Sequence, residues 1–170
     1  MRKFIEKNCI WLTLLPVIFV MVTIFIFSAQ VAEESQNTSD EWTDFVIRTF
    51  VSDFDGLPAA EQQELRDNVS FAVRKIAHFT EYTILGCALM LHLSAIGMKK
   101  QVPRAPLWAW GIGTLYAASD EFHQLFVEGR SMSLRDVGID SCGVLAGTLI
   151  VWLIVSSIGK RRAASKQIAA

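Results

Sequence analysis

Four long apolar stretches alternate with charged segments along the chain. They cover residues 9–29, 76–98, 106–127 and 137–158. A helix needs about 20 largely apolar residues to cross a hydrocarbon core of about 30 Å, and each stretch has that length. The pattern predicts an all-α, polytopic membrane protein, a bundle of four transmembrane helices.

The first apolar stretch follows a basic N-terminal segment, residues 1–8, as the core of a secretory signal does. The stretch is longer than a usual signal core, however, and residues 28–32 contain no good small-x-small cleavage site. We therefore expect an uncleaved first helix.

Residues 30–75 differ in character from the apolar stretches. Between 33 and 70 the chain has ten acidic residues and only two basic ones, so we expect an aqueous loop. Pro58 suits the first turn of a helix, and the next glycine in the pattern is Gly86. The second transmembrane helix is therefore expected to begin inside the loop.

The loop also carries an amphipathic pattern. Trp42, Phe45 and Phe50 recur at helical spacing, which indicates one apolar face. Thr38 and Glu41 have the spacing of a capping box, which would start a helix there. These residues predict a short interfacial helix that lies on the membrane surface.

The composition agrees with a membrane location. Of the 170 residues 52% are hydrophobic, which is more than a soluble domain of this size usually carries. The net charge is -1, so no overall basic field attracts nucleic acid, and we expect no nucleic-acid partner. Cys9, Cys87 and Cys142 all lie in apolar stretches and are expected to pack as small hydrophobes.

Basic residues set the expected orientation, because short loops rich in Lys and Arg stay in the cytoplasm. They gather at the N-terminus, in the turn before the third apolar stretch and in the tail, residues 159–170. With four spans these segments share one side of the membrane, so both termini are predicted to be cytoplasmic and the acidic loop external. The residues are Arg2, Lys3, Lys7, Lys99, Lys100, Arg104, Lys160, Arg161, Arg162 and Lys166.

Ionisable residues interrupt the second and third apolar stretches. The charge-free part of the third, residues 105–119, is about 15 residues or roughly 22 Å long, too short to cross. The charge-free part of the second, residues 82–98, reaches only about 25 Å. A crossing therefore draws Glu81 and Asp120 into the external half of the apolar slab, where an ionised side chain costs roughly 2.5–3.5 kcal/mol.

At helical spacing these polar side chains form one stripe on each of three helices. Because the stripes lie at one depth, we expect a common interior pocket, with Ser28 and Gln30 on its rim. On the fourth helix the stripe continues as Gly143 and Gly147, a GxxxG pair that allows close helix contact. The stripes are Arg74, His78, Glu81 and Tyr82; Tyr116, Asp120, His123 and Gln124; and Asp136 and Asp140.

The residue types in this pocket allow two interpretations. The charges could simply neutralise one another and hold the helices in register. Alternatively, Arg74, Lys75, Arg130 and Arg135 hold a phosphate, for which guanidinium groups are well suited. The remaining polar residues, Tyr82, Glu121, Gln124, Asp136 and Asp140, would then contact the same substrate.

Catalysis is a further possibility for this pocket. General acid and base roles would fall to His78, Glu81, Asp120 and His123. The same four side chains form a nitrogen and oxygen set that zinc or manganese could use, but the nearby arginines argue against a cation. We therefore expect no metal and no cofactor.

Several motifs in this order resemble the VanZ-like family of membrane proteins. The resemblance covers nearly the whole chain, apart from the acidic loop, and implies a single domain over about residues 9–158. The motifs are Phe27-Ser28-Ala29-Gln30, Arg74-Lys75-x-x-His78-Phe79-x-Glu81-Tyr82-x-x-Leu85-Gly86, Ser119-Asp120-Glu121-x-His123-Gln124, Gly129-Arg130 and Asp136-x-x-x-Asp140-x-x-Gly143.

The resemblance implies a four-helix protein of the bacterial cytoplasmic membrane and a role in resistance to the glycopeptide antibiotic teicoplanin. Together with the charges, it predicts that the pocket binds or modifies an anionic lipid-linked or cell-wall molecule at the outer leaflet, next to membrane lipids. Two alternatives stay open. One is a non-catalytic scaffold whose acidic loop docks an envelope protein; the other is a small transporter.

Overall fold

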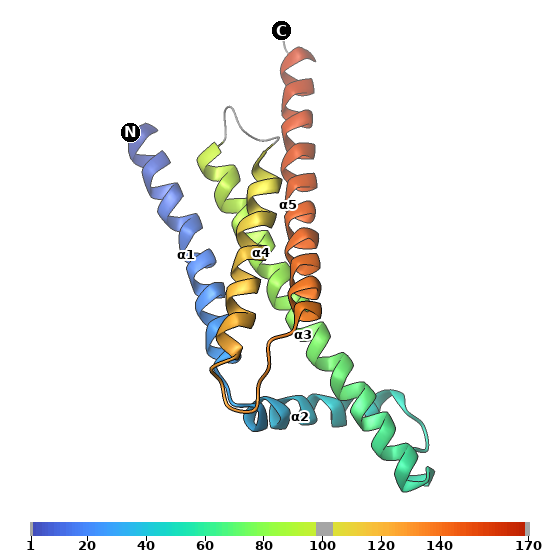
Figure 1. Cartoon of the computed structure of the whole chain (residues 1–170). Helices are drawn as coiled ribbons and strands as arrows, with labels where there is room; N and C mark the ends of the chain where they lie inside the picture. The colour runs from blue at the N-terminus through green and yellow to red at the C-terminus, as the bar shows by residue number, and fades with distance from the viewer. Residues whose placement is uncertain (1, 98–103, 169–170) are drawn as a thin grey trace.

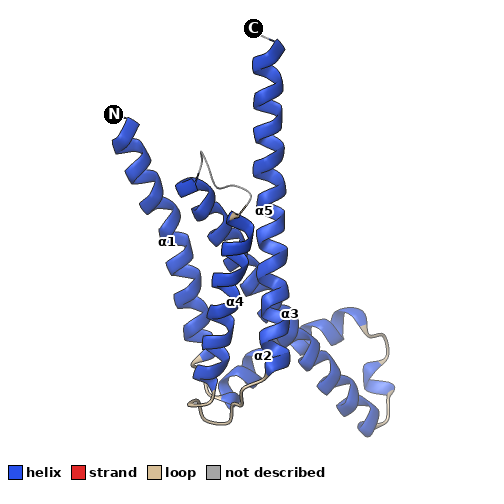
Figure 2. Cartoon of the chain, turned by 45° about the horizontal axis from the view of Figure 1, so that its top comes forward, coloured by secondary structure: helices blue, strands red, loops and turns tan. Residues whose placement is uncertain are grey.

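The computed structural model describes residues 2–97 and 104–168. This part of the chain forms helices joined by short loops, with no strand, which confirms the all-α prediction (Figure 2). The helices are α1 (Arg2–Ser28), α2 (Ala32–Phe50), the short 3₁₀ helix η1 (Phe54–Gly56), α3 (Ala59–Gly97), α4 (Ala105–Gln124) and α5 (Leu134–Ile168).

The helices α1, α3, α4 and α5 stand together as a bundle, and α2 lies across its end (Figure 1). The helix α3 is the centre of the bundle, because it contacts α1, α4 and α5. The helix α2 runs across the end opposite the two termini and packs on the first part of α3, which projects beyond the bundle. Both described ends of the chain therefore lie on the same side of the molecule.

Three helices are long and apolar enough to cross a membrane. Their apolar segments are Trp11–Ser28, Ala59–Ile96 and Leu134–Arg161. The helix α4 is 20 residues long but does not reach the same apolarity, because it ends in a run of polar residues, 119–121 and 123–124. The structure thus supports a membrane protein with three candidate spans, and the fourth span stays a prediction.

One local prediction needs correction. The helix α2 starts at Ala32 instead of at a Thr38 cap, and inside it the Thr38 hydroxyl donates to the Glu34 carbonyl at 3.2 Å. The early start is anchored from outside, because the Ala32 amide donates to the Glu128 carbonyl of a distant loop at 3.1 Å. The helix α4 ends at Gln124, where the chain tightens into i→i+3 bonds such as Phe126 N–H to the His123 carbonyl.

The contact between α3 and α5 is a close backbone approach. A Cβ atom on Gly143 would lie 2.6 Å from the Phe79 carbonyl oxygen, and one on Gly147 would collide with the Thr83 carbonyl oxygen. Gly86 of α3 approaches the Val144 carbonyl in the same way. The GxxxG pair therefore allows close helix contact, as the sequence predicts.

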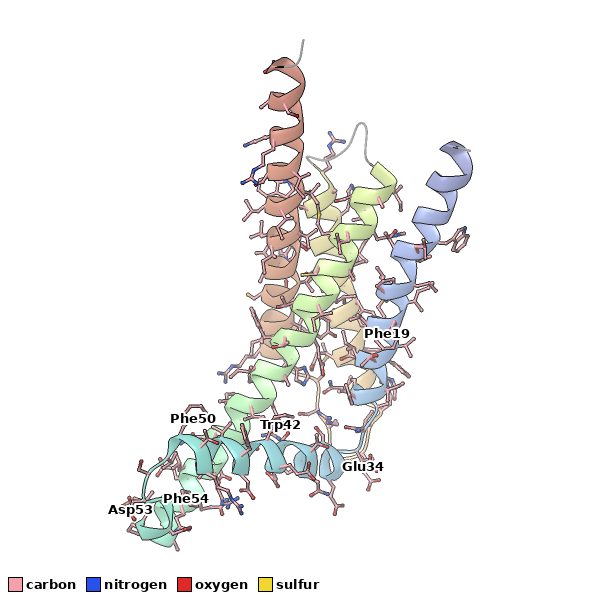
Figure 3. All side chains as sticks on the ribbon, turned by 180° about the vertical axis from the view of Figure 1, so that it is seen from behind. Phe19, Glu34, Trp42, Phe50, Asp53 and Phe54 are labelled. Carbon is pink, nitrogen blue, oxygen red and sulfur yellow. The ribbon has the colours of Figure 1, made fainter. Side chains whose placement is uncertain are left out.

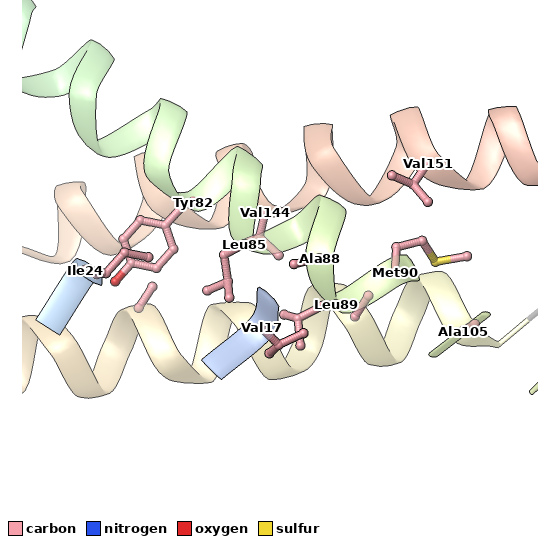
Figure 4. Packing of buried hydrophobic residues seen from close by; sticks show 12 residues of the cluster. Val17, Ile24, Tyr82, Leu85, Ala88, Leu89, Met90, Ala105, Val144 and Val151 are labelled. Atoms are coloured by element: carbon pink, nitrogen blue, oxygen red, sulfur yellow. The ribbon is translucent and has the colours of Figure 1, made fainter. Parts of the chain in front are cut away.

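Around this contact lies the apolar core. Tyr82, Leu85 and Val144 are fully buried where α3 meets α5, and Val17 and Ile24 close the cluster from α1 (Figure 4). The outward sides of the helices expose large apolar residues, including Phe19 and Leu115. An apolar exterior around a packed interior is what a lipid-facing bundle requires.

We predict that Gly147→Ala destabilises the protein, because its new methyl group would meet the Thr83 backbone, which cannot move aside. Overpacking of this kind costs about 1–3 kcal/mol. Gly138→Ala is the matched control on the same helix, because nothing lies within 4 Å of its Cβ position. Thermal unfolding midpoints in detergent should fall for Gly147→Ala and hold or rise for Gly138→Ala; equal midpoints would refute the contact.

Candidate functional site

A cavity of about 240 Å³ lies at the end of the bundle that α2 crosses. Its wall comes from the end of α1, the first half of α2, the middle of α3, the end of α4 and the loop after α4. The lining residues are Ile24, Phe27, Ser28, Gln30, Ser35, Thr38, Ser39, Trp42, Val73, Arg74, Ala77, His78, Glu81, Asp120 and Arg130. Five sequence-predicted site residues therefore meet here: Arg74, His78, Glu81, Asp120 and Arg130.

Two half-buried guanidinium groups face this cavity, and both are held by neutral oxygens. Arg74 donates to the Gln36 side-chain oxygen at 2.8 Å, and Arg130 donates through Nε to the Gln30 carbonyl at 3.3 Å. Neither guanidinium is within ion-pairing distance of a carboxylate among the described residues. The cavity thus contains two cations whose charge no neighbouring carboxylate neutralises by direct contact.

The charge of Arg74 also affects the pKa of Arg130. Burial lowers the pKa of Arg130, and the positive charge of nearby Arg74 lowers it further. An arginine stays protonated at neutral pH even so. Glu121 and Asp120 raise the pKa of Arg130, but burial and Arg74 outweigh them, so an added negative charge beside Arg130 would be favourable.

Acidic and imidazole side chains form the floor of the cavity. His78 and Glu81 come from α3 and Asp120 from α4, and Asp120 is only 4% exposed. Behind His78 lies Asp140 of α5, which is 0% exposed, with 3.6 Å between its carboxylate oxygen and His78 Nδ1. Neither Asp140 oxygen accepts a hydrogen bond from the described residues.

The rest of the wall is apolar. Ile24 and Phe27 contribute from α1 and Trp42 from α2, whose place beneath the bundle can be followed in Figure 3. Trp42 is largely exposed, as are Phe45 and Phe50 of the same helix. The cavity is therefore amphiphilic, with cationic and acidic groups beside an apolar surface.

Several sequence-predicted ligands lie outside the cavity wall and have other partners. Lys75 pairs with Asp136 at 2.5 Å, and the Arg135 guanidinium lies 5.1 Å from the centre of the Phe71 ring. His123 stacks on Phe25 of α1 at 4.7 Å between ring centres. These four residues occupy helix contacts around the cavity.

Three more of the predicted site residues stabilise the packing around the cavity. Glu121 is 1% exposed and accepts the Ser133 amide at 2.8 Å, which ties the loop after α4 to the bundle. Gln124 donates to the Ser28 hydroxyl at 3.1 Å. Tyr82 is fully buried beside Tyr116, at 6.3 Å between ring centres. Ser28 and Gln30 do line the cavity, as expected for its rim.

Sequence reasoning missed the contribution of α2 to this site. Ser35, Thr38, Ser39 and Trp42 line the cavity, and Gln36 holds Arg74. The amphipathic pattern predicted the helix and included Trp42, but it did not indicate which part of the bundle the helix covers. Only the tertiary fold provides that information.

No group of three or more His, Cys, Asp or Glu side chains at metal-binding distances occurs in the described part of the chain. The set of His78, Glu81, Asp120 and His123 is not assembled, since His123 turns to Phe25. The site instead combines hydrogen-bond donors, carboxyl groups and an imidazole, which can bind an anion and transfer protons.

The helical bundle and this polar interior fit the family that the motifs indicate. Residues 13–155 match the family model described as VanZ/LLP1, which covers most of the chain, so the chain belongs to the VanZ/LLP1 family. No curated protein and no solved structure matches the chain.

Proposed function

We propose that this VanZ/LLP1 protein binds the anionic group of a lipid-linked or cell-wall molecule at the outer leaflet of the bacterial cytoplasmic membrane. One observation carries the proposal: Arg74 and Arg130 face a cavity and, among the described residues, donate to neutral oxygens, although carboxyl groups line the same wall. Buried charges are normally paired, so such a site is suited to an anionic ligand.

The proposal includes a topology of four spans, with α4 as the short fourth member and α2 in the membrane interface. Three features support it. Both described chain ends lie on one side (Figure 1), basic residues such as Arg104 and Lys160 gather there, and α2 exposes Trp42, Phe45 and Phe50. Lys99 and Lys100, which also support this orientation, lie outside the described residues.

In this topology the cavity opens in the outer leaflet, next to lipid. A guanidinium can grip a phosphate with two parallel hydrogen bonds, which favours arginine over lysine at such a site. The apolar wall from Ile24, Phe27 and Trp42 would accommodate the first carbons of a lipid. The cavity is therefore complementary to both the anionic group and the apolar chain of an amphiphile.

We predict that Arg74→Ala and Arg130→Ala each weaken binding of phosphatidic acid to the purified protein in detergent. A charge-assisted hydrogen bond contributes about 1.5–3 kcal/mol, so the Kd should rise about tenfold or more. Arg66→Ala is the control, because Arg66 lies two turns earlier on α3 and pairs with Asp44 at 2.6 Å. Zwitterionic phosphatidylcholine should bind weakly to every variant. Equal Kd values for phosphatidic acid in all variants would contradict the proposal.

We predict the opposite effect for the acidic wall. Glu81→Gln and Asp120→Asn remove negative charge from the cavity while keeping side-chain shape, so phosphatidic acid should bind equally well or more tightly. The gain should be larger at higher pH, where the native carboxyl groups are ionised and repel the ligand. Titrations at two pH values measure this; weaker binding by both variants would mean that the carboxylates themselves attract the ligand.

We predict that resistance depends on the cavity if the family link to teicoplanin extends to this chain. Single alanine variants of Arg74, His78, Glu81 and Asp120 should raise teicoplanin susceptibility at matched membrane abundance. His123→Ala should do so less, because His123 lies against α1. If all variants match the parent while changes on the exposed acidic face of α2 alter susceptibility, the scaffold alternative gains support and the cavity loses its role.

A further inference from the structure

His78 lies between the cavity and a buried carboxylate. Its ring lines the cavity wall, and its Nδ1 is turned toward Asp140 at 3.6 Å. Because Nδ1 faces the carboxylate, Nε2 is the nitrogen available to a molecule in the cavity. Arg74 lies one turn earlier on α3, so its guanidinium and the imidazole share one face of the helix.

Among the described residues, His78 is the cationic partner that lies against Asp140. Its side chain is fully buried, and among the described residues no donor forms a hydrogen bond to either oxygen. The nearest cation on the same side, Lys75, is already paired with Asp136. At 3.6 Å the contact is electrostatic, and a buried carboxylate at this place stabilises the imidazolium and favours the tautomer with its proton on Nδ1.

We propose that the cavity hydrolyses a phosphate ester, with His78 as the general base and Asp140 as the positioning residue behind it. This inference rests on the proposed function, because Arg74 and Arg130 must first hold the phosphate. It adds a reaction and a substrate class, a phosphate monoester of a lipid alcohol.

The reaction consumes one water. His78 Nε2 takes a proton from that water as its oxygen bonds to phosphorus, and the bond from phosphorus to the ester oxygen breaks. Asp120, which enters the cavity from α4 instead of α3, gives a proton to the leaving alcohol oxygen. The products are a lipid alcohol and inorganic phosphate, and the proton on His78 returns to Asp120 through solvent.

The guanidiniums supply the remaining catalytic component. Charge spreads over the phosphate oxygens in the transition state, and fixed cations stabilise it without having to reorganise. The apolar wall distinguishes two sources of the same phosphate chemistry. A lipid phosphate can use Ile24 and Trp42, whereas a water-soluble ester such as glycerol phosphate cannot.

The test measures release of inorganic phosphate by the purified full chain in detergent from three probes: a polyprenyl phosphate, phosphatidic acid and glycerol phosphate. We expect release from at least one lipid probe and little from glycerol phosphate. General acid–base catalysis contributes about 10²–10⁴-fold, so His78→Gln should lower kcat at least about 100-fold while binding of phosphatidic acid changes little. Arg66→Ala should behave like the parent.

The variant Asp140→Asn tests whether Asp140 acts on His78 or only stabilises the fold. It should lower kcat with little change in KM and move the acidic limb of the pH profile, since the imidazole loses its anionic partner. Thermal unfolding of each variant identifies any that fails to fold.

If every probe stays intact while Arg74-dependent binding persists, hydrolysis is refuted and the binding function stands. If Arg74-dependent binding is also absent, the proposed function fails as well. Unchanged turnover in His78→Gln would overturn the role of His78.

Discussion

Ionisable side chains in apolar helices need partners, and this requirement organises the molecule. A charge that faces lipid costs several kcal/mol, whereas the same charge facing another helix can be paired or hydrated. The polar residues in the middle of α3 and at the ends of α1, α4 and their adjoining loops meet at one end of the bundle, and α2 covers that end. The resulting interior is polar and partly cationic, and Phe27 and Trp42 also line it.

The close approach of α3 and α5 sets the geometry of this interior. The two helices run in parallel, and their contacts advance in step: Lys75 with Asp136, His78 with Asp140, Phe79 with Gly143 and Thr83 with Gly147. Because Gly143 and Gly147 let the two backbones touch next to the site, Asp140 lies against His78. The packing residues and the polar residues therefore belong to one helix contact.

Much of this arrangement follows from spacing alone. The apolar stretches predict the helices, and the period of Arg74, His78 and Glu81 places them on one face. The family resemblance is confirmed by the match over residues 13–155. Helix ends were less predictable, because α2 starts at Ala32 through a bond to the distant Glu128 carbonyl. A contact between residues so far apart in the chain leaves no local signal.

The partners of the polar residues also could not be predicted from the sequence. The sequence predicted that Arg74 and Lys75 both hold the phosphate, but Arg74 faces the cavity and Lys75 pairs with Asp136. Likewise, His123 shares a helix face with Asp120 but stacks on Phe25. Small differences in helix rotation decide such cases, and they depend on packing across the whole bundle.

The most direct test of the central claim is an experimental structure of the protein in nanodiscs that contain an anionic phospholipid. The account predicts density for a phosphate between the guanidiniums of Arg74 and Arg130, with its lipid chain along Ile24 and Trp42. A structure in which both arginines form ion pairs with Glu81 and Asp120, with no space left between them, would contradict it.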